Sequence, residues 1–94
     1  MSLTEKIRTD MTAAMKAQEK DRLSTLRMLQ SALKNEQIHL GHELSDEEAM
    51  SVIRKAVKQR QDSIEQYTAA GRAELADKER AEMDLLRTYL PPEL

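Results

Sequence analysis

The stretch "KDRLSTLRMLQSALKNEQIHLG", residues 20–41, decides the fold of this chain, because its leucines recur every three or four residues. That spacing puts apolar side chains on one side of an α-helix. The predicted buried stripe consists of Leu23, Leu26, Leu29, Leu33 and Leu40. Asp21 can accept hydrogen bonds from the free amides of a first turn, and Gly41 can end the helix in a left-handed conformation. The pattern therefore predicts one amphipathic helix between Asp21 and Gly41.

The same stretch contains a second repeat, formed by basic residues at intervals of seven. Lys20, Arg27 and Lys34 form a column beside the leucine stripe, and this column steps back by only about 20° per heptad. At a rise of about 1.5 Å per residue, neighbouring charges lie roughly 10 Å apart. Two interpretations stay open. The column is either a ridge that binds phosphates or a set of long side chains whose stems cover the edge of the core.

Three further helices are predicted around this one. Residues 2–5 and residues 45–48 each have the S-x-x-E pattern of a helix start, and apolar residues then recur at helical spacing. Gly71 separates the third helix from the fourth, and the two prolines at 91–92 prevent the fourth from continuing. Short connections favour antiparallel neighbours. We therefore expect an all-α fold, a small four-helix bundle, with residues 1–94 forming a single helical domain.

The composition excludes several classes of function. The chain has no cysteine, so it has no disulfide, no thiolate nucleophile and no cysteine-ligated metal. Its two glycines cannot form a glycine-rich phosphate loop. No apolar run approaches the roughly 20 residues that span a bilayer, and the first ten residues lack the apolar core of a secretory signal. We expect a cytoplasmic protein without a membrane partner, and no catalysis by this chain alone.

The charge is nearly balanced over the whole chain but not along it. Fifteen Lys and Arg residues against 17 Asp and Glu residues give a formal net charge of −2, so no global basic field exists. The first 40 residues carry seven basic and five acidic side chains. Any affinity for anions is therefore expected in the first half of the chain.

Arg60 interrupts the apolar stripe of the third predicted helix, and a charge in such a position needs a partner. Glu79 and Glu82 lie likewise on the apolar stripe of the fourth helix. Arg60 and Glu82 are each 11 residues from Gly71, so an antiparallel hairpin brings them opposite one another. We predict an interior ion pair of Arg60 with Glu82 or Glu79 that fixes helix register. A catalytic or ligand-binding cluster is the alternative.

The histidines do not indicate a metal site. Residues 36–39 form one E-x-x-H motif, whereas di-iron helical bundles use this motif twice together with two further carboxylates. His39 and His42 fall near the predicted end of a helix, where they can interact with its dipole. We therefore expect neither a bound metal nor a cofactor.

Four motifs occur in order along the chain: R-L-S-x-L-R-M-L, K-x-R-x-D-S, A-G-R-x-x-L and Y-L-P-x-x-L. By these motifs the chain resembles the YqeY-like family over essentially all 94 residues. This GatB/YqeY domain is related to the tail domain of the B subunit of the glutamine-dependent tRNA amidotransferase. The resemblance implies a two-part helical fold. Its N-terminal four-helix part is expected in this chain, and its C-terminal three-helix part is expected to be absent.

The resemblance also implies a function linked to tRNA or to the amidotransferase pathway, and the family carries the label of a carbon–nitrogen ligase with glutamine as amido-nitrogen donor. The expected partners are tRNA and subunits of an amidotransferase or a synthetase. On this basis we assign nucleic-acid binding to Lys20, Arg22, Arg27 and Lys34. The alternative is a protein–protein interaction module or adaptor without RNA binding. The pattern sets no oligomeric state.

Overall fold

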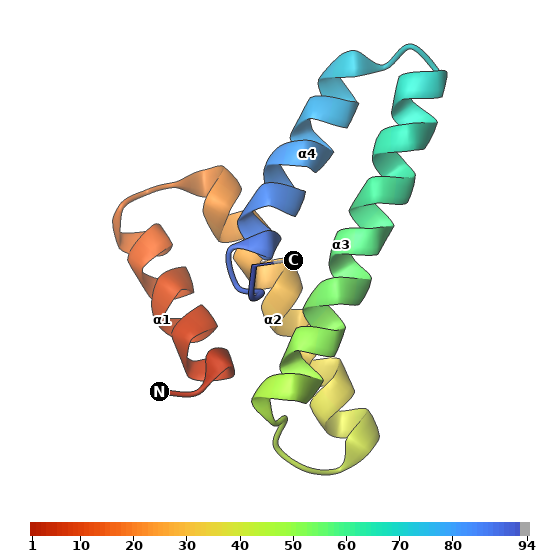
Figure 1. The fold of residues 1–94 in the computed structure, drawn as a ribbon. Helices are drawn as coiled ribbons and strands as arrows, with labels where there is room; N and C mark the ends of the chain where they lie inside the picture. Colours follow the sequence, from red (N-terminus) through yellow and green to blue (C-terminus); the bar gives the residue numbers. More distant parts are fainter. Residues whose placement is uncertain (93–94) are drawn as a thin grey trace. The chain divides into compact units, whose positions relative to one another are not determined.

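The computed structural model describes residues 1–92, which contain four α-helices joined by short turns and loops and no strand (Figure 1). The helices are α1 (Leu3–Lys16), α2 (Lys20–Leu40), α3 (Asp46–Ala69) and α4 (Ala73–Arg87). They fall into two units, of which the first is Met1–Val52 and the second begins at Ile53, so α3 starts in one unit and ends in the other. The prediction of an all-α fold with four helices is confirmed.

The first unit contains α1, α2 and the beginning of α3. Helix α1 packs against α2, and the apolar faces of both helices supply the core. The buried apolar residues of this unit are Ile7, Ala14, Leu26, Leu29, Leu33, Leu44 and Ala49. Each large side chain among them stabilises the fold by roughly 1.5–3 kcal/mol relative to an exposed position. Three of the five predicted stripe leucines of α2, Leu26, Leu29 and Leu33, are thus buried.

The other two stripe leucines are less buried than predicted. Leu23 is half-buried, and Leu40 is 41% exposed. The prediction of Leu40 as a core residue was wrong. Helix α1 has 14 residues and α2 has 21, so α1 is about 10 Å too short to cover the whole of α2.

The turn between α1 and α2 has a left-handed residue that is not glycine. Gln18 has φ 58°, its amide donates to the carbonyl of Met15 at 3.2 Å, and the Glu19 amide donates to Ala14 at 3.0 Å. This pair of bonds is the Schellman arrangement, which satisfies the last free carbonyls of a helix. Helix α2 then begins at Lys20, one residue earlier than its predicted cap.

The prediction that Asp21 caps α2 was wrong. The cap position is Glu19, whose side chain makes no capping hydrogen bond, and Asp21 lies in the first turn of the helix. The Asp21 carbonyl accepts a hydrogen bond from the buried Thr25 hydroxyl at 3.1 Å. The tight turn at Gln18 fixes the start of α2, so no side-chain cap is needed to define it.

The predicted glycine and serine signals around the next loop are confirmed. Gly41 ends α2 with φ 78°, and its amide donates to the Gln37 carbonyl at 2.9 Å. Ser45 and Glu48 then form a reciprocal capping box at the start of α3: each backbone amide donates to the other side chain, at 2.9 and 3.1 Å. Both ends of this loop are therefore set by local hydrogen bonds.

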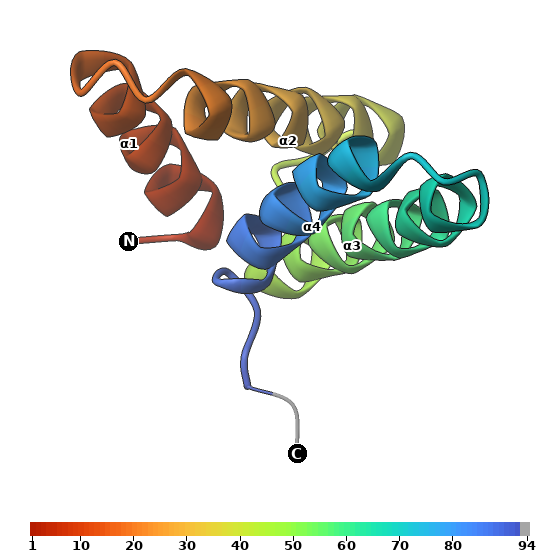
Figure 2. The ribbon, with the colours of Figure 1, turned by 90° about the horizontal axis from the view of Figure 1, so that it is seen from above.

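The second unit contains the rest of α3 and α4, which lie side by side in both ribbon views (Figures 1 and 2). Gly71, with φ 73°, reverses the chain between them. Its amide donates to Thr68 at 3.1 Å, and that of Arg72 donates to Tyr67 at 2.8 Å. The buried apolar residues of this unit are Ile53, Val57, Ala76, Leu86 and Tyr89. After α4, bonds such as Leu90 N–H to Arg87 C=O at 3.0 Å tighten the last turn ahead of the prolines.

Candidate functional site

The outer face of α2 displays the basic column. The buried leucines Leu26, Leu29 and Leu33 of α2 face the core. Lys20, Arg27 and Lys34 lie on another side of the helix, next to the half-buried Leu23, and all three are exposed. Within residues 1–92, none of these three side chains takes part in an ion pair or a hydrogen bond. Three cations with full capacity for an external anion therefore lie along one helix face.

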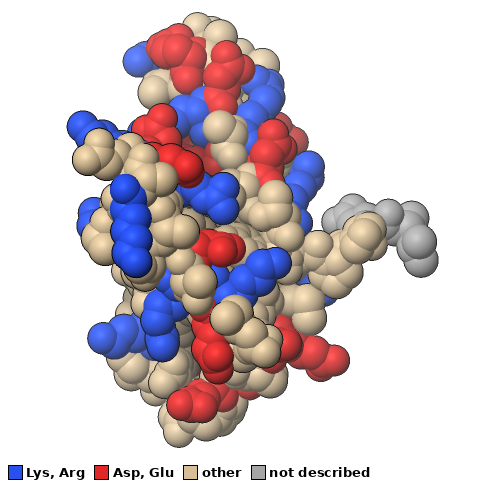
Figure 3. Space-filling view, turned by 90° about the vertical axis from the view of Figure 1, so that its left-hand side faces the viewer, with Lys and Arg blue, Asp and Glu red and all other residues tan. Residues whose placement is uncertain are grey.

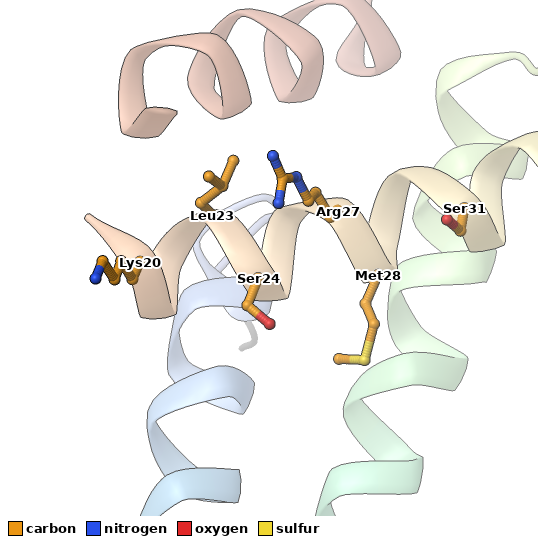
Figure 4. A pocket seen from close by; sticks show the side chains of 6 residues that line it. All are labelled: Lys20, Leu23, Ser24, Arg27, Met28 and Ser31. Carbon is orange, nitrogen blue, oxygen red and sulfur yellow. The ribbon is translucent and has the colours of Figure 1, made fainter. Parts of the chain in front are cut away.

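Two of these cations border a hollow in the surface. An open hollow of about 440 Å³ is lined by Lys20, Leu23, Ser24, Arg27, Met28 and Ser31, all on α2. Figure 4 shows Leu23 and Arg27 along one edge of the helix, and Ser24 and Met28 along the other. The hollow combines positive charge, hydroxyl groups and two apolar side chains, and such a combination suits an anionic partner that also has apolar or sugar surface.

The other predicted binding residues are placed differently. Lys34 lies three residues beyond Ser31 on the same face of α2 and continues the column past the hollow. Arg22 is exposed but lies roughly 160° around the helix from Lys20, and its Nε is 3.8 Å from a carboxylate oxygen of Glu19. The structure thus brings Lys20, Arg27 and Lys34 onto one face and leaves Arg22 on another.

The other residues that line the hollow were not predicted from the sequence. The leucine pattern placed Leu23 in the core, and neither Met28 nor the two serines had a predicted role. The sequence does contain a pattern that would have identified the two serines. Lys20, Ser24, Arg27 and Ser31 follow one another at steps of four, three and four residues. Residues at such steps share one face of a helix. Met28, which is 44% exposed, belongs to the edge of the same face.

The start of α3 is a second polar cluster, with a structural role. The pKa of the Glu48 carboxyl is lowered, chiefly because the Ser45 backbone amide donates to it, and secondarily by the Ser45 hydroxyl and the positive charge that His42 carries when protonated. His42 Nε2 lies 3.5 Å from Glu48, and its Nδ1 lies 2.8 Å from the Glu43 carbonyl oxygen. These contacts stabilise a helix start. No three His, Asp or Glu side chains in residues 1–92 converge as a metal site would require.

Arg60, Glu79 and Glu82 are all half-buried and belong to the second unit. Nη1 of Arg60 donates to the Ala56 carbonyl at 3.4 Å, and its Nε is inaccessible to solvent. Arg60 therefore does not point freely into water, and a partly buried charge of this kind needs a partner. Its pairing with Glu82 or Glu79 stays a prediction.

Charges of both signs are interspersed over the face drawn in Figure 3. Several of the exposed charges in the described residues belong to local pairs, such as Arg80 with Asp77 at 2.8 Å and Arg72 with Glu74 at 3.3 Å. Exposed pairs of this kind contribute only about 0–1 kcal/mol each. The three cations of the α2 column differ from these paired charges, because none of them has such a partner within residues 1–92.

The four motifs noted in the sequence agree with a comparison against known families. The family described as Yqey-like protein matches residues 4–94. The chain belongs to the Yqey-like protein family. Helix α2, with its basic column and hollow, lies wholly inside the matched region.

Three curated relatives of this Yqey-like chain are fungal proteins. "Altered inheritance of mitochondria protein 41, mitochondrial" of Saccharomyces cerevisiae (strain YJM789) is 33% identical over 85 residues, which are 89% of this chain and 46% of that protein. The protein of the same name in Lachancea thermotolerans is 32% identical with the same coverage. "Uncharacterized protein C22F3.15" of Schizosaccharomyces pombe is 33% identical, over 90% of this chain and 69% of that protein. The chain thus spans about half the length of the first two relatives.

Proposed function

We propose that this chain is a non-catalytic helical module that binds tRNA, or acts in the glutamine-dependent tRNA amidotransferase pathway, through the outer face of α2. The observation that carries the proposal is the column of Lys20, Arg27 and Lys34, exposed and unpaired within residues 1–92. Cations at intervals of roughly 10 Å can each meet a phosphate of a polyanion. Arg22 is a further contact with a smaller effect, since Glu19 already neutralises part of its charge.

The proposal assigns no chemical step to the chain, although the family label is that of a carbon–nitrogen ligase with glutamine as amido-nitrogen donor. An activated nucleophile needs a base within hydrogen-bond reach. The chain has no cysteine, and the ring of His42 is already engaged with Glu43 and Glu48. Transfer of the amide group belongs to other subunits in this proposal, and the chain acts by holding RNA. We place this activity in the cytoplasm.

The experiment is a titration of tRNA with this chain, followed by fluorescence anisotropy at several salt concentrations. Each phosphate contact contributes about 0.7–0.9 to the slope of log K against log salt. Changing Lys20, Arg27 and Lys34 together to alanine should therefore flatten the slope by roughly 2–3 units.

A matched control removes three exposed cations that lie outside the column. The variant Arg8→Ala, Lys55→Ala, Lys78→Ala changes the net charge by the same amount and draws its residues from α1, α3 and α4. Its salt slope should stay close to that of the parent chain. If the parent chain binds no tRNA at low salt, the proposal is wrong; if both variants flatten the slope equally, net charge and not the column causes the binding.

One observation favours a second candidate function, that of an adaptor docking on an amidotransferase or synthetase subunit. Leu23 and Met28 line the hollow together with Lys20 and Arg27, and exposed methionine is frequent at adaptable protein-binding surfaces. Substitution of Met28 by glutamine separates the two candidates. It should weaken a protein partner that fills the hollow, and it should leave the salt slope for tRNA unchanged because no charge is altered.

A further inference from the structure

The outer face of α2 alternates cations with hydroxyl groups. Lys20, Ser24, Arg27, Ser31 and Lys34 follow one another at steps of four, three, four and three residues, and all five are exposed. The mean step of 3.5 residues keeps them on one side of the helix, at a rise of roughly 5 Å from each group to the next. Hydroxyls at this period can act together with the charges, as donors or as acceptors.

This alternation matches the chemistry of a ribose–phosphate backbone. Along an RNA strand each phosphate is followed by a sugar whose 2′-hydroxyl can both donate and accept a hydrogen bond. Lysine and arginine suit the phosphates, while Ser24 and Ser31 suit the sugar hydroxyls. DNA offers the same phosphates but lacks the 2′-hydroxyl, so the two serines have no equivalent partner on it.

The face also favours a double-stranded partner over a single strand. Proteins that hold single strands stack the bases on aromatic side chains, which contributes about 1–3 kcal/mol per base. This chain has no Phe or Trp, Tyr89 is buried and Tyr67 is half-buried, and neither is on α2. Double-stranded RNA is recognised instead by its shape, its phosphates and the 2′-hydroxyls of its wide, shallow minor groove. A straight helix with groups at a fixed period suits such a rigid surface.

We infer that α2 recognises the backbone of an RNA duplex, such as a stem of a folded RNA, with Lys20, Arg27 and Lys34 on phosphates and Ser24 and Ser31 on ribose hydroxyls. This inference rests on the proposed function and names the part of the RNA that the same face contacts. Leu23 and Met28, which line the hollow from opposite edges of α2, lie against sugar surface in this arrangement. Base identity is not read.

The experiment compares three probes with the full chain by fluorescence anisotropy at low salt. The probes are an RNA duplex of about 16 base pairs, the DNA duplex of the same sequence, and a uridine single strand with the same number of phosphates. The RNA duplex should bind at least about threefold more tightly than the DNA duplex and about tenfold more tightly than the single strand. Folded tRNA is titrated in parallel.

The double variant Ser24→Ala, Ser31→Ala tests the serines. It should lower the affinity for the RNA duplex to that for the DNA duplex and leave the salt slope unchanged, since it removes hydroxyls and no charge. Alanine is the best helix former, so α2 should be retained, which circular dichroism checks. The variant Ser51→Ala, Ser63→Ala, with both serines on α3, is the matched control and should bind like the parent chain.

The outcomes separate this inference from the proposed function. If tRNA binds while the uridine strand binds as tightly as the RNA duplex, the duplex inference is overturned and the proposed function stands. Equal affinity of the parent chain for RNA and DNA duplexes, with binding of tRNA retained, overturns the role of the serines. If neither tRNA nor the RNA duplex binds at low salt, the proposed function fails and the inference fails with it.

Discussion

At the scale of single residues, Gln18 is the one residue other than glycine within residues 1–92 that has a positive φ. Its φ of 58° is left-handed, where a residue with a Cβ is less stable than glycine by roughly 1–2 kcal/mol. Replacing Gln18 by glycine removes this strain, but part of the gain in stability is lost because glycine loses more conformational entropy on folding than other residues. We therefore expect Gln18→Gly to raise the free energy of unfolding by about 0.5–1 kcal/mol, measured by urea denaturation.

A glutamine in regular helix gives the control for this prediction. Gln59 is exposed in the middle of α3, and Gln59→Gly should lower the free energy of unfolding by about 1 kcal/mol. Opposite signs for the two substitutions would establish that backbone conformation decides the effect. A destabilising Gln18→Gly would mean that the turn is not left-handed in solution.

At the scale of elements, the capping box makes the start of α3 sensitive to pH. In the folded state the pKa of Glu48 lies below its ordinary value of 4.5, so folding favours the charged form of this carboxyl. The unfolded chain therefore takes up protons first as the pH falls. The stability that the Glu48 charge contributes is complete above about pH 4.5, and it is lost as the pH drops through the lower folded value.

Glu48→Gln tests this dependence. The glutamine can still accept a hydrogen bond from the Ser45 amide, but it carries no charge. We expect a lower melting temperature than that of the parent chain at pH 7, and a difference that shrinks as the pH falls below about 4.5. Glu47→Gln is the control, because Glu47 occupies the same first turn without a hydrogen bond in the described residues. A Glu48→Gln difference that stays constant from pH 7 to pH 3 would contradict a stabilising role for the Glu48 charge.

Local signals in the sequence predicted most element boundaries, since caps and turns depend on a few adjacent residues. Gly41, Gly71 and the pair Ser45 and Glu48 act as predicted because their hydrogen bonds lie within a single turn. The start of α2 was mispredicted at Asp21, because a left-handed glutamine leaves no signal that distinguishes it from a helical one. The periodicity of apolar residues predicted that the elements are helices. The start of α2, in contrast, depends on the left-handed conformation of Gln18, which glutamine disfavours.

At the scale of the whole molecule, prediction failed where residues far apart in sequence meet. The Leu3 amide donates to Oδ1 of Asp46 at 2.9 Å and so joins the start of α1 to the start of α3, across 43 residues. No sequence pattern indicates this bond, and the exposure of Leu40 depends likewise on how far α1 extends along α2. The basic column could be predicted as an exposed face from its spacing. The hollow could not be predicted, because its shape depends on the side-chain conformations of the α2 residues that line it, such as Leu23 and Met28.

The register between α3 and α4 is the tertiary feature that the sequence predicts most specifically. Arg60 and Glu82 are both half-buried, on helices that lie side by side, at equal separations from Gly71 (Figures 1 and 2). If they form an ion pair, each single substitution leaves a partly buried charge without its partner, whereas the double substitution removes both. A double-mutant cycle with Arg60→Met and Glu82→Gln should therefore give a coupling energy of about 1–2 kcal/mol in the free energy of unfolding.

Two further cycles make this result specific. A second cycle that uses Glu79→Gln in place of Glu82→Gln identifies the partner of Arg60, because only the carboxylate that pairs with Arg60 should give a large coupling energy. The exposed pair of Arg80 and Asp77, 2.8 Å apart on α4, should couple by only a few tenths of a kcal/mol. Arg60 and both candidate carboxylates are half-buried, whereas Arg80 and Asp77 are exposed. A coupling energy at Arg60 no larger than that at Arg80 would therefore mean that no interior ion pair fixes the register. The packing of Val57 and Leu86 in the core would then set it instead.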